Sequence, residues 1–329
     1  MKKCFFAFSA VFVLLFSGCS QERAEGFAGG TEFLLDTICT ITIFDPPDHA
    51  LISRSFELCA EYEALFSITI EGSDIWRVNH ANGTPATVSP STLEIIMEGM
   101  RYGGLSGGMF DITIGRLSGL WDFSGDSGIP DEADIELAGK TVDYTQIISH
   151  GDTIQLNNPD AWIDLGGIAK GYIADRIADF LVENGVESAI IDLGGNIVTI
   201  GEGPGGRLWL VGVRAPFGGD GEYFGIIEAG AASIVTSGTD QRSFDIDGEL
   251  FHHILDPFTG WPVTSDVISA TVVTSSSLAG DAMSTILLLA GSENAAELIR
   301  QSPDVIGALL ILDNGSHVLH GDIGFALMQ

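Results

Sequence analysis

An acid and a hydroxyl lie four positions apart in a stretch that is otherwise apolar, residues 277–291, which read SLAGDAMSTILLLAG. If this stretch is a helix, Asp281 and Thr285 fall one turn apart on the same face. Carboxylate and hydroxyl oxygens are hard ligands, which suit Mg²⁺ or Ca²⁺ better than zinc. The pair therefore indicates a site for a hard divalent cation. The alternative is structural: Thr285 bonds back to a carbonyl and Asp281 caps the helix.

A second stretch has the features of an anion-binding corner. Residues 163–175 read IDLGGIAKGYIAD, so Asp164 ends an apolar run, two glycines follow, and Lys170 falls in the first turn of a predicted helix. Glycines let a backbone approach a ligand closely, and a helix N-terminus favours negative charge. The spacing matches neither the Walker A loop nor the GxGxxG pattern. The alternative is an ordinary strand–turn–helix corner with a surface lysine.

Two further stretches each carry one candidate residue. Residues 252–263 read HHILDPFTGWPV and place His253 just before a turn. Histidine exchanges protons near neutral pH, so His253 is a candidate general base, with a structural role as the alternative. Residues 106–121 read SGGMFDITIGRLSGLW and place Asp111 after a glycine-rich turn and before a predicted strand.

The charge of the chain limits what it can bind. The 329 residues include 14 Lys and Arg against 45 Asp and Glu, which gives a formal net charge of −31. Such a surface repels phosphate backbones, so we exclude nucleic acid as a partner. A phosphorylated substrate must then be held by a cation, by backbone N–H groups or by a few local basic residues. Because the sequence has no CxxC motif or Cys/His cluster, it does not favour zinc.

Local patterns predict both helices and strands. Residues 49–66 have helical spacing, and residues 90–104 read as a helix that begins with a proline after a serine. Residues 33–45 alternate and are rich in β-branched side chains, which predicts one strand. Asp247-Gly248 and Asn314-Gly315 are typical of hairpin turns.

The second half of the chain predicts the fold class. Residues 161–200 read as strand, helix, strand and strand, with DLGG closing an apolar run at 164–167 and again at 192–195. Residues 270–291 read as a strand, a serine-rich cap and a helix. Hairpins mixed with helices predict an α+β fold, with mixed or antiparallel sheets and packed helices, rather than a doubly wound sheet.

The N-terminus predicts export. Residues 1–19 contain two lysines, a short apolar run and small residues, which is typical of a secretory signal, and Phe16-Ser17-Gly18-Cys19 resembles a bacterial lipobox. We therefore expect lipidation of Cys19 and anchoring to the extracytoplasmic face of the bacterial membrane; an ordinary cleaved signal is the alternative. Residues 20–32 read as a tether and residues 33–329 as one folded unit. Cys39 and Cys59 would remain, and whether they pair is open.

Together these segments resemble one family, the FAD:protein FMN transferases, or ApbE-like flavin transferases. The resemblance runs from about Phe33 to the last helix, in the same order, and rests on DLGGIAKGYIAD, TSGTDQRSF (236–244), HHILDPFTGWPV, GGMFDITIG and AGDAMST. It implies a single ApbE-like catalytic unit that binds FAD with Mg²⁺ and splits the pyrophosphate. FMN would be joined to a threonine or serine of an acceptor flavoprotein, such as a membrane redox-pump subunit, and AMP would leave.

The resemblance also assigns roles by position. Metal ligands would be Asp281, Thr285 and the Gly167 carbonyl, and His253 would activate the acceptor hydroxyl, with Lys170 as a second catalytic candidate. FAD-contacting positions would be Leu35, Thr69, Met109, Phe110, Asp111, Asp164, Lys170 and Ile254. Thr69 stands where some relatives carry a tyrosine that stacks on the flavin, so that contact is not expected here. Two other functions stay open: an FAD pyrophosphatase that uses water, and a non-catalytic flavin-binding lipoprotein. Retention of Asp281, Thr285 and His253 argues against the second.

Overall fold

An eight-stranded antiparallel sheet forms the centre of the fold in the computed structural model, which describes residues 26–123, 128–219 and 221–328. Every neighbouring pair in this sheet is antiparallel. Its strands, in spatial order, are β1 (Ala28–Leu34), β2 (Thr37–Asp45), β6 (Ser188–Leu193), β7 (Asn196–Ile200), β10 (Ala232–Gly238), β13 (Val267–Thr274), β14 (Val305–Leu312) and β15 (His317–Gly321).

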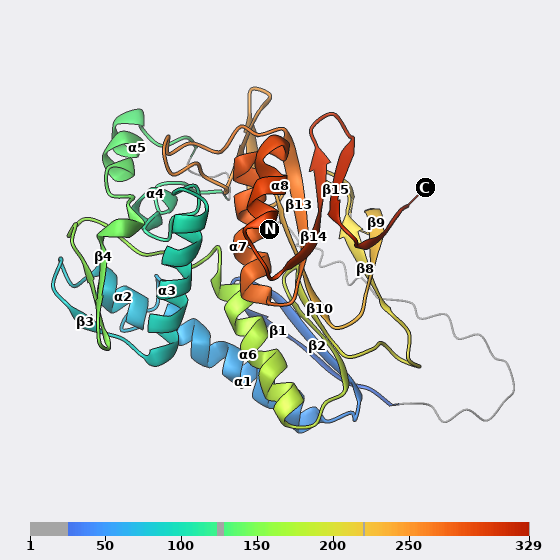
Figure 1. Cartoon of the computed structure of the whole chain (residues 1–329). Coiled ribbons are helices and arrows are strands. Elements are labelled where there is room, and N and C mark those ends of the chain that lie inside the picture. The colour runs from blue at the N-terminus through green and yellow to red at the C-terminus, as the bar shows by residue number, and fades with distance from the viewer. Residues whose placement is uncertain (1–25, 124–127, 220, 329) are drawn as a thin grey trace, which may run out of the picture.

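Helices cover one face of this sheet, where the largest buried core lies. They are α1 (His49–Phe66), α6 (Ala169–Glu183) and α7 (Ser277–Ala290), followed by α8 (Ser292–Arg300). Figure 1 shows α1, α6 and α7 lying side by side along the sheet. The position of α1 depends on a glycine, because a Cβ on Gly30 of β1 would lie 2.8 Å from Ile52 and 2.9 Å from Phe56.

A second, three-stranded sheet covers part of the other face. It consists of β8 (Trp209–Arg214), β9 (Tyr223–Ala229) and β16 (Gly324–Leu327). The inward side chains of β8 alternate with exposed ones, and Trp209, Val211 and Val213 form a separate buried cluster with residues of the central sheet. The central sheet therefore has a helical face and a β face, and the candidate residues of α6 and α7 lie on the helical one.

A third group of elements lies beyond the helices, at the left of Figure 1. It contains α2 (Asp74–Asn79), β3 (Ala86–Thr87), α3 (Pro90–Leu105), α4 (Gly115–Ser118), α5 (Glu132–Gly139), a 3₁₀ turn (Tyr144–Gln146), β4 (Ile147–His150) and β5 (Thr153–Leu156). The remaining hairpin is β11 (Ser243–Ile246) and β12 (Glu249–His252), directly before His253.

The predicted α+β class is confirmed, as are the elements with strong local signals. The helix predicted over 49–66 is α1, with Asp48 as its N-cap, and the helix predicted over 90–104 is α3, capped by Ser89. The two Asp-Gly and Asn-Gly hairpins are also present, between β11 and β12 and between β14 and β15. The strand, cap and helix predicted over 270–291 are β13, Ser276 and α7.

Four local predictions are wrong. Residues 33–45 form two strands rather than one, because Leu35 and Asp36 both adopt φ of 55° and turn the chain between β1 and β2. Strand β1 begins at Ala28, so residues 28–32 belong to the sheet and not to a tether. Neither residues 161–167 nor residues 111–115 form a strand: the two segments meet only in an isolated bridge between Ile114 and Trp162.

The predicted signal and Cys19 lie outside the described residues. Among the described helices, none has both the length and the apolarity to cross a membrane. Cys39 and Cys59 are buried free thiols, and the hydrogen bond that the Cys59 thiol donates to Cys39, together with burial, raises the pKa of Cys59.

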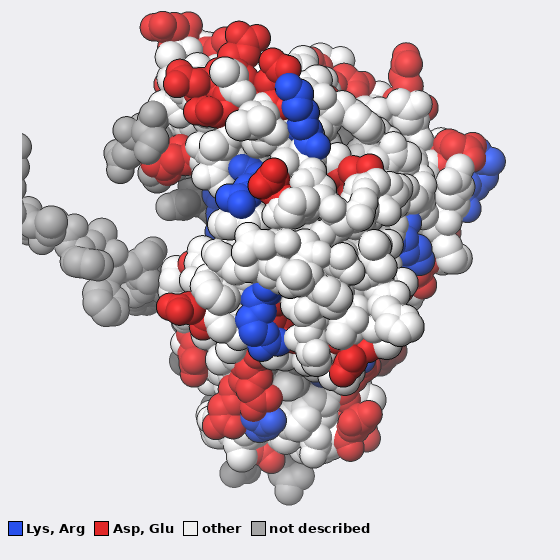
Figure 2. Space-filling view, turned by 90° about the vertical axis from the view of Figure 1, so that its left-hand side faces the viewer, with Lys and Arg blue, Asp and Glu red and all other residues white. Residues whose placement is uncertain are grey.

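The charge of the molecule is unevenly distributed. Figure 2 shows that, on the face formed by the third group of elements, acidic side chains gather towards the top and bottom of the view. A broad area across the middle of that face carries few charged residues of either sign. The net charge of −31 therefore does not imply a uniformly acidic surface.

Candidate active site

Close packing of α6 against α7 brings Asp281 to the start of α6. A Cβ on Gly171 would lie 2.3 Å from the Ser277 carbonyl oxygen and 2.7 Å from the Leu278 Cα, so a glycine is needed for this approach. The Gly171 N–H donates to Asp281 Oδ2 at 2.9 Å. Asp281, which is only 4% exposed, therefore satisfies an N–H group in the first turn of α6 that has no partner within its own helix.

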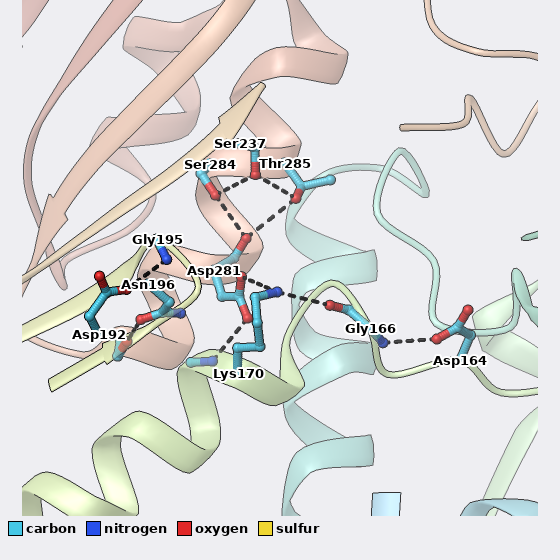
Figure 3. Close-up of polar contacts among 12 residues, drawn as sticks. Asp164, Gly166, Lys170, Asp192, Gly195, Asn196, Ser237, Asp281, Ser284 and Thr285 are labelled. Atoms are coloured by element: carbon cyan, nitrogen blue, oxygen red, sulfur yellow. Dashed lines mark hydrogen bonds and ion pairs between the residues drawn. The ribbon is translucent and has the colours of Figure 1, made fainter. Parts of the chain in front are cut away.

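Lys170 connects Asp281 to the glycine corner (Figure 3). Its Nζ lies 3.7 Å from Asp281 Oδ1 and donates to the Gly166 carbonyl oxygen at 3.5 Å. The Gly166 N–H in turn donates to Asp164 Oδ1 at 2.9 Å, and Ser118 Oγ donates to Asp164 Oδ2 at 2.7 Å. The corner at 164–170 and the face of α7 that carries Asp281 are thus in contact, as the cation hypothesis requires.

Other residues cap α7, which excludes part of the structural alternative for Asp281. Ser276 Oγ accepts from the Ala279 N–H at 3.3 Å. The carboxylate of Asp175 accepts from the Ser277 and Leu278 N–H groups at 2.7 Å and 3.0 Å. Asp281 therefore does not cap its own helix, and its one N–H contact is with α6.

Thr285 lies in a cluster of hydroxyl groups. Its Oγ1 is 3.4 Å from the Asp281 carbonyl oxygen, so the predicted back-bond is present but long. Oγ of Ser237, from β10, lies 3.2 Å from Thr285 Oγ1 and 2.8 Å from Ser284 Oγ (Figure 3). Thr285 is half-buried, whereas Ser284 is fully buried. Asp281 and Thr285 are neighbours on one face of α7, and Thr285 reaches the edge of the protein interior.

His253 is held in the form that can accept a proton. Its Nδ1 lies 2.9 Å from the Gln241 carbonyl oxygen, which can only accept, so in the neutral ring Nδ1 carries the hydrogen and Nε2 has a free lone pair. Burial, helped by the positive charges of Arg242 and Lys170, lowers the pKa of His253 to about 4. Near neutral pH His253 is therefore an uncharged imidazole within electrostatic range of Lys170, suited to general-base catalysis.

The loop before α4 lies against the glycine corner. A Cβ on Gly167 would lie 3.1 Å from the Phe110 ring, so this ring covers the corner directly. The Asp111 carboxylate is occupied: Oδ1 accepts from the Thr113 N–H and hydroxyl at 2.8 Å and 2.6 Å, and Oδ2 accepts from the Tyr144 N–H at 2.8 Å. Burial raises the pKa of Asp111 despite these bonds. Its carboxylate thus fixes the loop that carries Phe110.

The other predicted FAD positions are distributed around this centre. Leu35 lies in the β1–β2 turn, and its N–H donates to Glu63 Oε1 at 2.8 Å near the C-terminal end of α1. Thr69 is exposed just after α1, bonded to Ser67 Oγ. Met109 packs against the main core, and Ile254, 5% exposed, follows His253. Within the described part of the chain, neither Leu35 nor Thr69 forms a hydrogen bond or ion pair with Lys170 or Asp281.

The side chains present fit a hard cation that is shared with a substrate. Within residues 26–123, 128–219 and 221–328, no three His, Cys, Asp or Glu side chains lie close enough to hold a metal ion together. The available donors are instead the Asp281 carboxylate, the Thr285 hydroxyl and backbone carbonyls such as that of Gly167. Mg²⁺ commonly binds one or two carboxylates and takes its other ligands from substrate phosphates and water, which matches this donor set.

Sequence reasoning missed three residues that build the site. Gly171 and Asp175 lie in the stretch 163–175, but their roles depend on α7, which is more than a hundred residues away in the chain. Ser237 lies in the family-like stretch TSGTDQRSF and was given no role. A spacing of four between Gly171 and Asp175 on an otherwise apolar helix face was the available signal for the first two.

Comparison with known proteins identifies the family. The chain matches the ApbE family over residues 35–310, and the chain therefore belongs to this family. A FAD:protein FMN transferase of Klebsiella pneumoniae is 38% identical over 277 residues, which cover 83% of this chain and 85% of the relative. A FAD:protein FMN transferase of Treponema pallidum is 31% identical over 303 residues, covering 86% of this chain and 84% of the relative. The family predicted from the motifs is confirmed.

Solved structures agree with the sequence comparison. The crystal structure of an ApbE protein from Thermotoga maritima has a TM-score of 0.81 and 27% identity, and the match covers 90% of this chain and 97% of that one. The flavin transferase ApbE from Vibrio cholerae has a TM-score of 0.79 and 25% identity, with the same coverage of 90% and 97%. The architecture described above is thus that of the ApbE flavin transferases.

Proposed function

We propose that this protein is an FAD:protein FMN transferase that moves FMN from FAD to a threonine or serine hydroxyl of an acceptor flavoprotein. The observation that carries the proposal is the contact between Lys170 and Asp281 across the glycine corner, at 3.7 Å. It brings a lysine and a buried carboxylate together at a helix N-terminus, which supports the binding of a pyrophosphate there. The curated relatives at 38% and 31% identity carry the same activity in their names.

The reaction needs a deprotonated hydroxyl and a stabilised leaving group. The acceptor oxygen attacks the phosphorus of the FMN half, a new P–O bond forms, the bond to the bridging oxygen breaks, and AMP leaves with that electron pair. His253 Nε2 takes the hydroxyl proton, because the neutral ring has its other nitrogen bonded to the Gln241 carbonyl. Such general-base catalysis contributes typically ~10²–10⁴-fold.

Lys170 and the start of α6 hold the charged part of FAD in this proposal. Lys170 provides a local positive charge in a chain of net charge −31, and the N–H groups of the corner add a partial one. The Asp164 carboxylate accepts hydrogen bonds from the Gly166 N–H and the Ser118 hydroxyl. Asp164 therefore holds the glycine corner in place as well as lining it. The remaining FAD contacts are proposed for Leu35, Met109, Phe110, Ile254 and the backbone at Asp111.

Asp281, Thr285 and the Gly167 carbonyl would hold Mg²⁺. When bound, this ion would offset the negative charge that the phosphate oxygens carry in the transition state of phosphoryl transfer. The support for this assignment is the donor chemistry: the oxygens are hard, Asp281 and Thr285 lie one turn apart on α7, and the carboxylate of Asp281 already attracts one cation, Lys170. Loss of the ion would leave substrate and Asp281 repelling one another.

Acceptor labelling tests the proposal. Purified protein, FAD, Mg²⁺ and a flavoprotein domain from a membrane redox pump should give a fluorescent acceptor band that survives denaturation. An acceptor domain whose target threonine is replaced by alanine is the matched control and should stay dark. Free FMN and AMP without labelled acceptor would mean that water is the nucleophile, and the FAD pyrophosphatase would then be the function.

Export and anchoring form a separate part of the proposal. We propose that Cys19 is acylated and holds the enzyme at the extracytoplasmic face of the bacterial membrane, close to membrane-bound acceptors; the lipobox-like sequence before Cys19 supports this. Growth with radiolabelled palmitate should label the wild-type protein and not a Cys19→Ala variant. Label in both proteins would disprove lipidation at this residue.

A further inference from the structure

A chain of hydroxyl groups behind Thr285 has two arrangements of hydrogens that leave the threonine oxygen free, and one of them uses the three shortest contacts. Three hydroxyls, those of Ser237, Ser284 and Thr285, and the Asp281 carbonyl share four close contacts. Each hydroxyl has one hydrogen to donate and two lone pairs. Three hydrogens must therefore be distributed over four contacts (Figure 3). The direction in which each hydroxyl donates decides which oxygen has lone pairs that accept no hydrogen bond.

In one arrangement each of the three shortest contacts is a hydrogen bond. Thr285 donates to Ser237 at 3.2 Å, Ser237 donates to Ser284 at 2.8 Å, and Ser284 donates to the Asp281 carbonyl at 3.0 Å. The long contact of 3.4 Å between Thr285 and the same carbonyl is then not needed. In this arrangement no hydrogen points at Thr285 Oγ1, so both of its lone pairs face away from the cluster.

In the other direction Ser237 donates to Thr285. One lone pair of Thr285 is then occupied, and the threonine hydrogen is left with the 3.4 Å contact with the Asp281 carbonyl. A cation at Thr285 Oγ1 would repel an incoming hydroxyl hydrogen and would therefore exclude this arrangement. Of the two that remain, the one in which Thr285 donates to Ser237 uses the shorter contact, 3.2 Å against 3.4 Å for the Asp281 carbonyl. The fully buried Ser284 completes the chain, since it has few other partners available.

We propose that Ser237 is a positioning residue for the cation: it accepts the Thr285 hydrogen and so turns the Thr285 oxygen towards Mg²⁺. This rests on the proposed function, because it assigns Thr285 to the metal. Ser237 itself does not touch the metal or the substrate; it acts through Thr285. Partners that orient a metal ligand in this way are typically worth 10–100-fold in metal affinity.

The test measures metal binding without turnover. Mn²⁺ is titrated into the protein by electron paramagnetic resonance, with FAD present, acceptor absent and His253→Ala as the common background, so that FAD is preserved. Ser237→Ala should raise the Mn²⁺ dissociation constant about 10–100-fold. Ser237→Thr, which restores a hydroxyl, should return it to within about threefold of the parent.

Thr236→Ala is the matched control. Thr236 precedes Ser237 in β10, its side chain is on the opposite face of the strand, and its Oγ1 contacts Thr271 Oγ1 at 2.8 Å instead of the cluster. The Thr236→Ala variant loses one hydroxyl from β10, as Ser237→Ala does, and it should bind Mn²⁺ with the affinity of the parent. The melting temperature of each metal-free variant separates a loss of metal affinity from a loss of fold.

The outcomes separate this inference from the proposed function. Asp281→Ala in the same titration should abolish tight Mn²⁺ binding; if it does not, the metal assignment itself is wrong. If Asp281→Ala loses Mn²⁺ while Ser237→Ala binds it like the parent, only the role of Ser237 is overturned. A Ser237→Ala defect that Ser237→Thr does not repair, or that Thr236→Ala shares, would also overturn it.

Discussion

Lys170 Nζ lies 3.7 Å from Asp281 Oδ1, although the two residues are 111 positions apart in the chain and lie on different helices. The lysine belongs to the first turn of α6 and the aspartate to α7. The contact forms because Gly171 lets the two helices approach until backbone atoms nearly touch. A helix N-terminus, a lysine and a buried carboxylate thus meet at one point.

Replacing Lys170 should weaken FAD binding more than it slows the transfer step. Lys170→Gln keeps the length of the side chain approximately but removes its charge, and with it the attraction for a pyrophosphate. We expect the KM for FAD to rise about tenfold in acceptor labelling, the size of one charge-assisted hydrogen bond. Lys140→Gln is the matched control, because Lys140 pairs with Glu136 on the exposed surface of α5. An unchanged KM in Lys170→Gln would exclude a phosphate role.

The pH dependence of labelling should reflect the low pKa of His253. Burial lowers this pKa to about 4, so the ring is neutral and able to accept a proton throughout the range above that value. The rate should therefore stay level as pH falls from about 8 to about 5.5, whereas a solvated histidine, with its pKa near 6.5, would lose most activity over that range. A midpoint near 6.5 in the acid limb would contradict the buried, neutral base.

The same shift has a consequence for stability. In the unfolded chain this histidine takes up its proton near pH 6.5, but in the folded protein only near 4. Between these values the unfolded state binds more protons, so the contribution of His253 to stability falls as pH is lowered.

Replacement of His253 by alanine should leave FAD affinity unchanged and slow transfer by ~10²–10⁴-fold. An equal loss of both would show a structural role.

Gly171 should tolerate no side chain. Gly171→Ala would place a Cβ 2.3 Å from the Ser277 carbonyl, and separating α6 from α7 should cost about 1–3 kcal/mol of unfolding free energy or more. Gly139→Ala is the control, since Gly139 is also helical but has no atom within 4 Å of the added Cβ. That variant should be neutral or up to about 1 kcal/mol more stable. Urea unfolding of both variants measures the difference; equal stabilities would contradict the packing argument.

Elements with local signals could be predicted from the sequence. The helical spacing of residues 49–66 predicts helix α1 with its observed bounds, and the Asp247-Gly248 and Asn314-Gly315 hairpins contain the residues that such turns require. The turn at Leu35 and Asp36 was missed because neither residue is a glycine, although both have positive φ. The apolar run at 161–167 predicts a strand, and its alternate residues Ala161, Ile163 and Leu165 are buried, but its only pairing in the described structure is the isolated bridge at Trp162.

The site was predictable to the extent that single residues carry chemistry. Asp281, Lys170 and the glycine corner were identified by residue type and spacing, and the structure brings them into contact. Ser237 and Asp175 act through α7, and a serine in a strand or an acid on a helix gives no sign of its partner. The sequence predicts that Asp111 contacts FAD, but it does not show that the Asp111 carboxylate accepts three hydrogen bonds within the protein. The donors are the N–H and hydroxyl of Thr113 and the N–H of Tyr144, which the fold brings to Asp111.

The most direct test of the central claim is the Mg²⁺ dependence of acceptor labelling in the wild type and in Asp281→Ala. The wild type should label the acceptor in proportion to added Mg²⁺ and stop when a chelator removes the ion, because the metal and Asp281 act together on the phosphates. Asp281→Ala should remain unlabelled at every Mg²⁺ concentration that saturates the wild type. Labelling at the wild-type rate by Asp281→Ala in chelator-treated buffer would contradict the account.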